Sequence, residues 1–223
     1  QAPPLRRQVF ARGPVDLFLE GNAHQRTYNR HQAAMSRCGI DIRGRSRKLY
    51  LNYRTTEEIR RQAVALLEGC EVDDLDEGPD EIRRYKSVSH GPAPQVLTVS
   101  GLEGAAEVAV SFIRDWQAGE GEEVSLTFCV ITPSEKTREA MALQLQARGL
   151  RTIAITAQSN HADAKGVIHL ATMHRAKGLE FDGAIVVAHQ DDLGEPELTL
   201  PRRRLLYVAL TRAKRGALLA LMA

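Results

Sequence analysis

Residues 95–116 read QVLTVSGLEGAAEVAVSFIRDW, and this stretch begins the pattern that decides the fold. Val96 to Val99 predicts a short strand, and the apolar positions that follow recur at helical spacing from Ala105 to Trp116. The chain then repeats the alternation with a predicted strand at 124–131, a helix at 135–148 and a strand at 152–155. Strands that alternate with helices of this length favour a parallel sheet covered on both faces. The sequence therefore predicts a three-layer α/β domain.

The same alternation continues toward the C-terminus. We predict strands at 167–171 and 184–188, a helix near 203–213 and a last strand at 217–221. In the other direction, strands are predicted at 15–20 and 48–51. A helix capped by Thr55 or Thr56 follows, and Gly69 stops it. The acidic and then Pro- and Gly-containing stretch 71–94 is expected to be a surface excursion.

The composition limits the possible classes of protein but does not identify a function. The 223 residues are 43% hydrophobic and 26% charged, which suits one full domain and a smaller piece. No apolar run approaches the roughly 18 residues of a membrane span, so we expect a cytoplasmic protein without membrane contact. The net charge of +2 does not announce a nucleic-acid binder, although basic residues crowd into 37–54 and 202–215. The cysteines and histidines show no metal-ligand spacing, so no metal site is predicted.

Two segments carry the most specific chemistry. Residues 172–181 (TMHRAKGLEF) follow a predicted strand and contain a glycine that allows close backbone approach. Residues 203–214 (RRLLYVALTRAK) place Arg212 near the end of an apolar helix, where it could project into a cleft. A buried arginine without a partner is costly, so we expect Arg212 to meet an anion from protein or ligand.

Two weaker segments share the same logic. Gly21 to Gln25, followed by Tyr28, comes just after a predicted strand, and Leu51 to Arg54 ends another. An amide or guanidinium at a strand end can contact a phosphate, and an exposed tyrosine can stack on a base. We expect the polar clusters to lie where strands end or helices begin, because open α/β sheets bind ligands there.

Together these strings resemble the motifs of the UvrD/Rep family of superfamily 1 DNA helicases. Residues 21–28 resemble motif III, 51–55 motif IV, 172–181 motif V and 203–214 motif VI, in the family's order. The resemblance implies a RecA-like fold of the P-loop NTPase type with a mainly parallel sheet. The short interval between 155 and 167 leaves no room for an inserted helical subdomain. It also implies that residues 1–45 are the tail of a first RecA-like domain and residues 46–223 the second.

The resemblance implies a role for each matching residue. Gln25, Arg54 and Arg212 match catalytic contacts to the γ-phosphate of ATP. Tyr53, Gly178 and Glu180 match contacts to the nucleotide. Tyr28, Thr172 and His174 match contacts to single-stranded DNA. The family moves 3′ to 5′ along DNA, and we expect the same polarity here.

Some features of the family pattern are absent. The family usually has Gly-Asp where this chain has Gly21-Asn22, and two acidic residues where it has Pro201-Arg202, which puts full-strength hydrolysis in doubt. The sequence contains no G-x-x-x-x-G-K-[ST] loop and no strand ending in paired acids for Mg²⁺. The family places both before Gln1, so we expect a fragment or truncated product. Its isolated form should lack ATPase activity, and its partner should be the upstream RecA-like domain.

Two other readings remain open from the residues alone. A non-catalytic adaptor that binds nucleic acid or protein is favoured slightly by Asn22 and Pro201, whereas the joint presence of Gln25, Arg54 and Arg212 favours the motor. A nuclease would need an Asp/Glu/Lys constellation at a sheet edge, and the sequence offers none that is persuasive.

Overall fold

A parallel six-stranded sheet forms the centre of the protein. The computed structural model describes residues 50–70, 85–119, 125–156 and 166–223. Within them, the sheet has the order β3-β8-β7-β4-β6-β5, and every neighbouring pair is parallel. The strands are β3 (Gln95–Val99), β4 (Phe128–Thr132), β5 (Thr152–Ala154), β6 (Ile168–Thr172), β7 (Phe181–His189) and β8 (Ala213–Met222). This confirms the predicted α/β class with a mainly parallel sheet.

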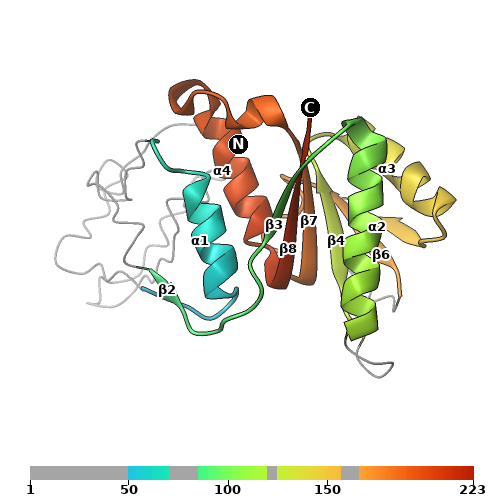
Figure 1. Cartoon of the computed structure of the whole chain (residues 1–223), viewed down its shortest axis with the longest axis horizontal. Coiled ribbons are helices and arrows are strands. Elements are labelled where there is room, and N and C mark those ends of the chain that lie inside the picture. Colours follow the sequence, from blue (N-terminus) through green and yellow to red (C-terminus); the bar gives the residue numbers. More distant parts are fainter. Residues whose placement is uncertain (1–49, 71–84, 120–124, 157–165) are drawn as a thin grey trace, which may run out of the picture.

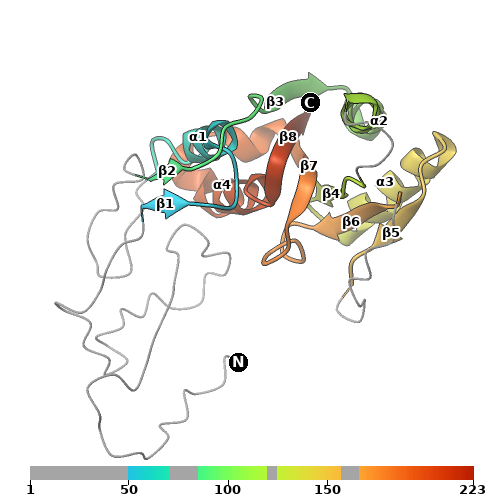
Figure 2. The same ribbon diagram turned by 90° about the horizontal axis from the view of Figure 1, so that it is seen from below.

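Helices cover both faces of this sheet, so the domain has three layers. The helices are α1 (Glu57–Ala65), α2 (Gly101–Gly119), α3 (Glu135–Ala147) and α4 (Pro196–Leu210), with a short 3-10 helix η4 (Gln190–Leu193) before α4. Figure 1 shows α1 and α4 on one side of the strands and α2 and α3 on the other, and Figure 2 shows the same division from below. None of the described helices is long and apolar enough to cross a membrane.

The central strand β4 belongs to two hydrophobic cores. Cys129 and Ile131 pack with the residues of α1 and α4, whereas Phe128 and Val130 pack with those of α2 and α3. Successive side chains of a strand point to opposite faces, so a strand between two helical layers must be apolar at every position. All five residues of β4 are indeed buried.

The last helix is longer at its start than predicted and shorter at its end. α4 begins at Pro196 rather than near Arg203, and the chain is already in β8 at Ala213. The first turns of α4 are mostly exposed, with Leu198 77% exposed, so they carry no apolar repeat that marks a helix. Proline at the first helical position is tolerated because its missing N–H has no partner there.

A small unit formed by α1, β1 (Leu51–Asn52) and β2 (Lys86–Ser87) lies beside α4. The predicted cap is confirmed, because the Thr56 side chain accepts a hydrogen bond from Ile59 N at 3.4 Å. β1 and β2 pair in parallel, so the described part of the excursion at 85–94 contains a strand. The strand predicted at 48–51 is found at 51–52, and residues 48 and 49 lie outside the described residues.

Two connections return the chain to the amino-terminal edge of the sheet. β6 and β7 are both parallel to β4, with Thr172 opposite Thr132 and Gly183 opposite Phe128. The segment 173–180 therefore runs back along the sheet without forming a helix, and we call it the return segment. α4 makes the second return, and Arg212 comes directly before β8. The expectation that polar clusters follow strands is thus wrong for Glu180 and Arg212, because both precede strands.

Candidate functional site

Three segments far apart in sequence meet at the amino ends of β7 and β8. Arg54 Nε lies 2.5 Å from Glu180 Oε1, and these two side chains are 44% and 40% exposed. Arg212 lies next to Glu180 in the fold, because its backbone oxygen accepts a hydrogen bond from Phe181 N at 3.0 Å. Arg54, Glu180 and Arg212 come from the loop before α1, the return segment and the end of α4. We call these three residues the arginine site.

Arg212 is buried, with only 1% of the residue exposed. Its guanidinium donates to Val208 O at 2.8 Å, to Thr211 Oγ1 at 3.1 Å and to Leu179 O at 3.4 Å. The sequence predicted an arginine that projects into a cleft, but the side chain is held by oxygens at the end of its own helix and in the return segment. No carboxylate among the described residues forms an ion pair with it.

The surroundings of Arg212 make its charge costly. Burial, followed by the positive charge of Arg54, lowers the pKa of Arg212 from its usual value of 12.5 to about 10, and Glu180 opposes this change. The side chain is still cationic at neutral pH. A buried cation that only neutral oxygens hold is stabilised by a nearby anion, which Glu180 supplies in part. The arginine site therefore has the electrostatics of an anion-binding site.

The loop that carries Arg54 is shaped by its own side chains. Arg54 N donates to Asn52 Oδ1 at 2.8 Å, the local bond by which asparagine stabilises a turn. Tyr53, between them, is 76% exposed, so its ring is accessible to a ligand.

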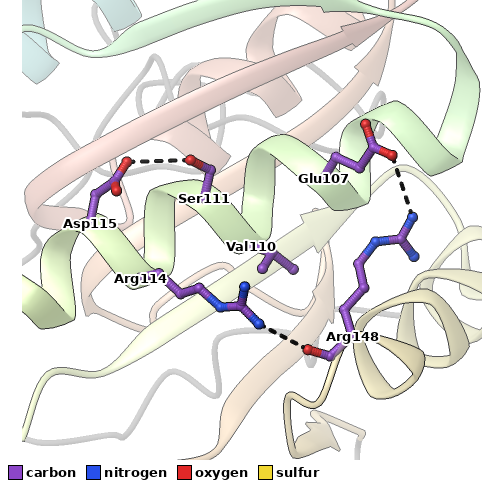
Figure 3. Close-up of a pocket in the computed structure, with 6 residues that line it drawn as sticks. All are labelled: Glu107, Val110, Ser111, Arg114, Asp115 and Arg148. Carbon is purple, nitrogen blue, oxygen red and sulfur yellow. Dashed lines mark hydrogen bonds and ion pairs between the residues drawn. The ribbon is translucent and has the colours of Figure 1, made fainter.

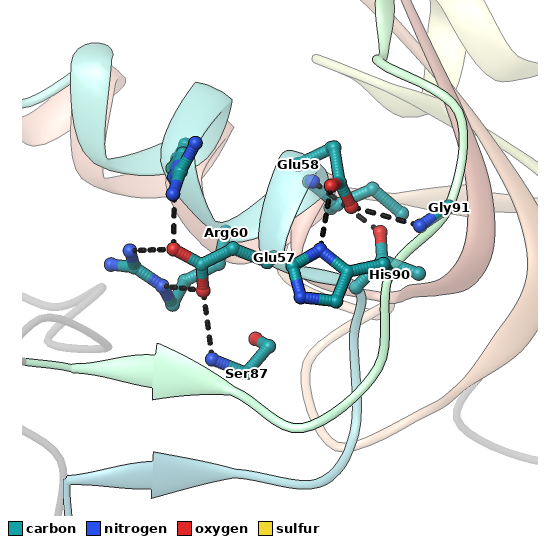
Figure 4. A network of polar contacts seen from close by, with 9 residues as sticks. Glu57, Glu58, Arg60, Ser87, His90 and Gly91 are labelled. Carbon is teal, nitrogen blue, oxygen red and sulfur yellow. Dashed lines mark hydrogen bonds and ion pairs between the residues drawn. The ribbon is translucent and has the colours of Figure 1, made fainter.

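A buried carboxylate that the sequence interpretation missed anchors this loop. Glu57 accepts two hydrogen bonds from Arg60, at 2.6 and 2.8 Å, one from Arg61 Nε at 2.9 Å and one from Ser87 N at 2.7 Å. Figure 4 shows these bonds converging on one side chain between α1 and β2. The bonds from Arg60, and more weakly from Ser87 and Arg61, lower the pKa of Glu57 to about 2 against desolvation. The spacing of Glu57 to Arg60 and Arg61 was the available signal.

Glu58, the residue after Glu57, makes a second link to the segment after β2. Glu58 Oε1 lies 2.9 Å from His90 Nδ1, and Glu58 Oε2 accepts from Gly91 N at 2.9 Å (Figure 4). These contacts, that with His90 first, lower the pKa of Glu58 to about 2. Two adjacent glutamates therefore hold the start of α1, and with it the loop of Tyr53 and Arg54, against the chain at 87–91.

The return segment presents the predicted motif V residues at both edges of the sheet. Thr172 ends β6 and is mostly buried, and its hydroxyl accepts from Arg175 N at 3.4 Å. His174 is exposed near the carboxyl edge, whereas Glu180 lies at the amino edge. Gly178 has φ +88°, and an added Cβ would meet nothing within 4 Å, so glycine is needed there for its conformation rather than for space.

Two of the predicted site residues fall in a part of the chain that the structure does not describe. Gln25 and Tyr28 lie outside the described residues, as does the predicted first domain at 1–45. Among the described residues, no group of three or more His, Cys, Asp or Glu could hold a metal ion.

The first arginine of the motif VI string has a structural position. Arg203 donates to Thr199 Oγ1, to Leu66 O at the end of α1, and to Leu193 O and Gly194 O before α4. It therefore joins α1, η4 and α4 through carbonyl groups that the helix ends leave without partners. The sequence interpretation gave Arg203 no role of its own.

A groove lies between α2 and α3, away from the arginine site. Figure 3 shows its polar groups bonded to one another: Arg114 Nη2 donates to Arg148 O at 3.2 Å, and Arg148 Nη2 lies 3.8 Å from Glu107 Oε1. None of the predicted site residues lines it. We interpret it as a packing groove between two helices.

Comparison with known proteins agrees with this architecture. The UvrD-like helicase C-terminal domain family matches residues 168–220, from β6 into β8. The ATP-dependent DNA helicase UvrD1 of Mycobacterium leprae (strain TN) is 31% identical over 168 residues, which cover 68% of this chain and 21% of that protein. The solved C-terminal domain of a possible DNA helicase from Lactobacillus plantarum WCFS1 has a TM-score of 0.56 and 24% identity, covering 77% of this chain and 88% of that one.

The fold is thus an α/β domain with a parallel sheet, similar to that solved helicase C-terminal domain. More particularly, the family match and the relative support a UvrD-like helicase C-terminal part, as the four motifs predicted. The match spans only about a fifth of the curated relative's length.

Proposed function

We propose that this chain is the second RecA-like half of an ATP-dependent DNA helicase or translocase. In this proposal it supplies two arginines to the γ-phosphate of ATP and contacts to single-stranded DNA. The upstream RecA-like domain supplies the phosphate loop and the acids that hold Mg²⁺, so the isolated chain does not hydrolyse ATP. Movement is 3′ to 5′, by the family resemblance.

The placement of Arg54 and Arg212 near one carboxylate, which Arg54 contacts and Arg212 does not, carries this proposal. Two guanidinium groups from separate segments give the arginine site a net positive charge, which suits the polyanionic phosphates of a nucleotide. The exposed ring of Tyr53 next to Arg54 offers a stacking surface for the adenine base. In the proposal, the guanidinium groups of Arg54 and Arg212 face the γ-phosphate of ATP, and the bond between the β- and γ-phosphates is the one that is hydrolysed.

The return segment provides a route from the nucleotide to DNA. It follows Thr172 at the carboxyl edge of the sheet and carries the exposed His174. It ends at Glu180 in the arginine site. In the proposal, Thr172 and His174 contact the strand, together with Tyr28 from the upstream part. A change at the nucleotide therefore reaches the DNA through one short stretch of chain.

The test is substitution of Arg212 in the complete protein that contains this chain. Arg212→Ala should lower the DNA-stimulated ATPase rate by about 10³-fold or more and leave single-strand affinity nearly unchanged, because arginine-finger losses have this size. Arg212→Lys keeps the charge but loses the forked donor geometry, so it should also be impaired. Thermal unfolding of both variants checks that the buried site still folds. A loss of less than tenfold in a folded Arg212→Ala protein would return Arg212 to a structural role.

A further inference from the structure

The Glu180 carboxylate forms an ion pair with Arg54 in the arginine site. We propose that Glu180 is the resident counter-ion of Arg54 and Arg212, which a nucleotide phosphate must displace before it binds. In this role Glu180 weakens triphosphate binding and keeps Arg54 turned into the site while no nucleotide is present. The inference rests on the proposed function, because it concerns the regulation of the same site.

The backbone holds Glu180 in position from both sides. Leu179 O accepts from Arg212 Nη1 at 3.4 Å, and Phe181 N donates to Arg212 O at 3.0 Å. Glu180 thus lies between two residues that are both bonded to Arg212. These two bonds fix the backbone of the Glu180 segment next to Arg212 independently of the contact with Arg54.

Arg54, by contrast, is held to Glu180 from a different part of the fold. The contact of Arg54 Nε with Glu180 Oε1 links the loop before α1 to the return segment. Both side chains are about two-fifths exposed, and ion pairs of this kind are weak enough to exchange partners. A phosphate with several oxygens offers Arg54 a bidentate partner that one carboxylate oxygen does not.

The charges of the arginine site predict the direction in which nucleotide affinity changes when Glu180 is neutralised. Two arginines and one glutamate leave the site with one net positive charge, and neutralising Glu180 would leave two. Removing the carboxylate should therefore favour a bound triphosphate. A glutamate that only contacts the nucleotide favourably, as the family resemblance implies, predicts the opposite result for the same substitution.

The experiment measures equilibrium binding of ATPγS and of ADP, each with Mg²⁺ and without DNA, to the complete protein that contains this chain. Glu180→Gln removes the charge and keeps the size. We expect ATPγS to bind about two- to fivefold more tightly than to the wild type, the range of an exposed ion pair. ADP should change less because it lacks the γ-phosphate, and the gain should shrink as salt rises.

Two controls separate this effect from a general charge effect. Glu139→Gln on α3 removes a carboxylate whose side chain is 73% exposed and should leave both affinities unchanged. In an Arg54→Ala background, Glu180→Gln should lose most of its effect, because the displaced pair no longer exists. Unchanged or weaker ATPγS binding by Glu180→Gln overturns this inference alone. Absence of ATPγS binding by the wild-type protein overturns the proposed function itself.

Discussion

Replacing Glu57 by glutamine tests how firmly the loop of Tyr53 and Arg54 is anchored. The wild-type carboxylate is mostly buried, its side chain being only 7% exposed, and it accepts hydrogen bonds from Arg60, Arg61 and Ser87 N. Glutamine keeps the shape but loses the charge and one of the two acceptor oxygens. The substitution therefore leaves donors of the network without a partner.

The size of the effect follows from the pKa. A folded-state pKa of about 2, against an ordinary value of 4.5, corresponds to at most about 3 kcal/mol of stability at neutral pH. Arg61 is 71% exposed and is screened by water, so we expect between about 1 and 3 kcal/mol. Because the folded pKa is lowered, this stability is present above pH 5 and is lost as the pH falls toward 2.

Urea unfolding of the wild type and of Glu57→Gln between pH 7 and pH 3 measures this contribution to the free energy of unfolding. The free energy of unfolding of Glu57→Gln should lie below that of the wild type at pH 7. The gap should narrow below pH 5, because the Glu57 carboxylate of the unfolded wild type takes up a proton there while that of the folded protein does not. Glu139→Gln, at an exposed position of α3, should change the free energy by less than about 0.5 kcal/mol. A gap that stays constant from pH 7 to pH 3 would refute the assignment of this stability to the Glu57 charge.

Three further outcomes can be measured. The isolated chain should show no ATPase activity with or without single-stranded DNA, and robust turnover in a phosphate-release assay would contradict this. In the complete protein, Tyr28→Ala should cost roughly 1–3 kcal/mol of single-strand binding in a fluorescence titration, with little change in its salt dependence, and His174→Ala should cost less. Gly183→Ala should lower the free energy of unfolding by about 1–3 kcal/mol, because its Cβ would lie 2.5 Å from the buried Phe128 ring, whereas Gly119→Ala, whose Cβ meets nothing within 4 Å, should not.

The position of Arg203 shows where pattern reading reached its limit. Arg203 and Arg212 belong to the same motif VI string, but only Arg212 was matched to a phosphate contact, and Arg203 was given no role. In the fold, Arg203 is occupied by carbonyls of η4 and α1, and Arg212 lies beside Glu180. Residues one after another on a helix face different neighbours, and those neighbours come from chain segments that no local pattern contains.

The sequence by itself determined the fold class and the resemblance to UvrD-like helicases. Alternating strands and helices with mostly apolar strands, such as β4, indicate a sheet buried on both faces, and the motif order pointed to a UvrD-like C-terminal part. Only the tertiary structure decided how the site is arranged. Strand directions in the sheet carry the return segment and α4 back to the amino edge, which places Glu180 beside Arg212. The contact of Arg54 with Glu180 then depends on two segments more than a hundred residues apart, and such distant contacts are set by packing rather than by local periodicity.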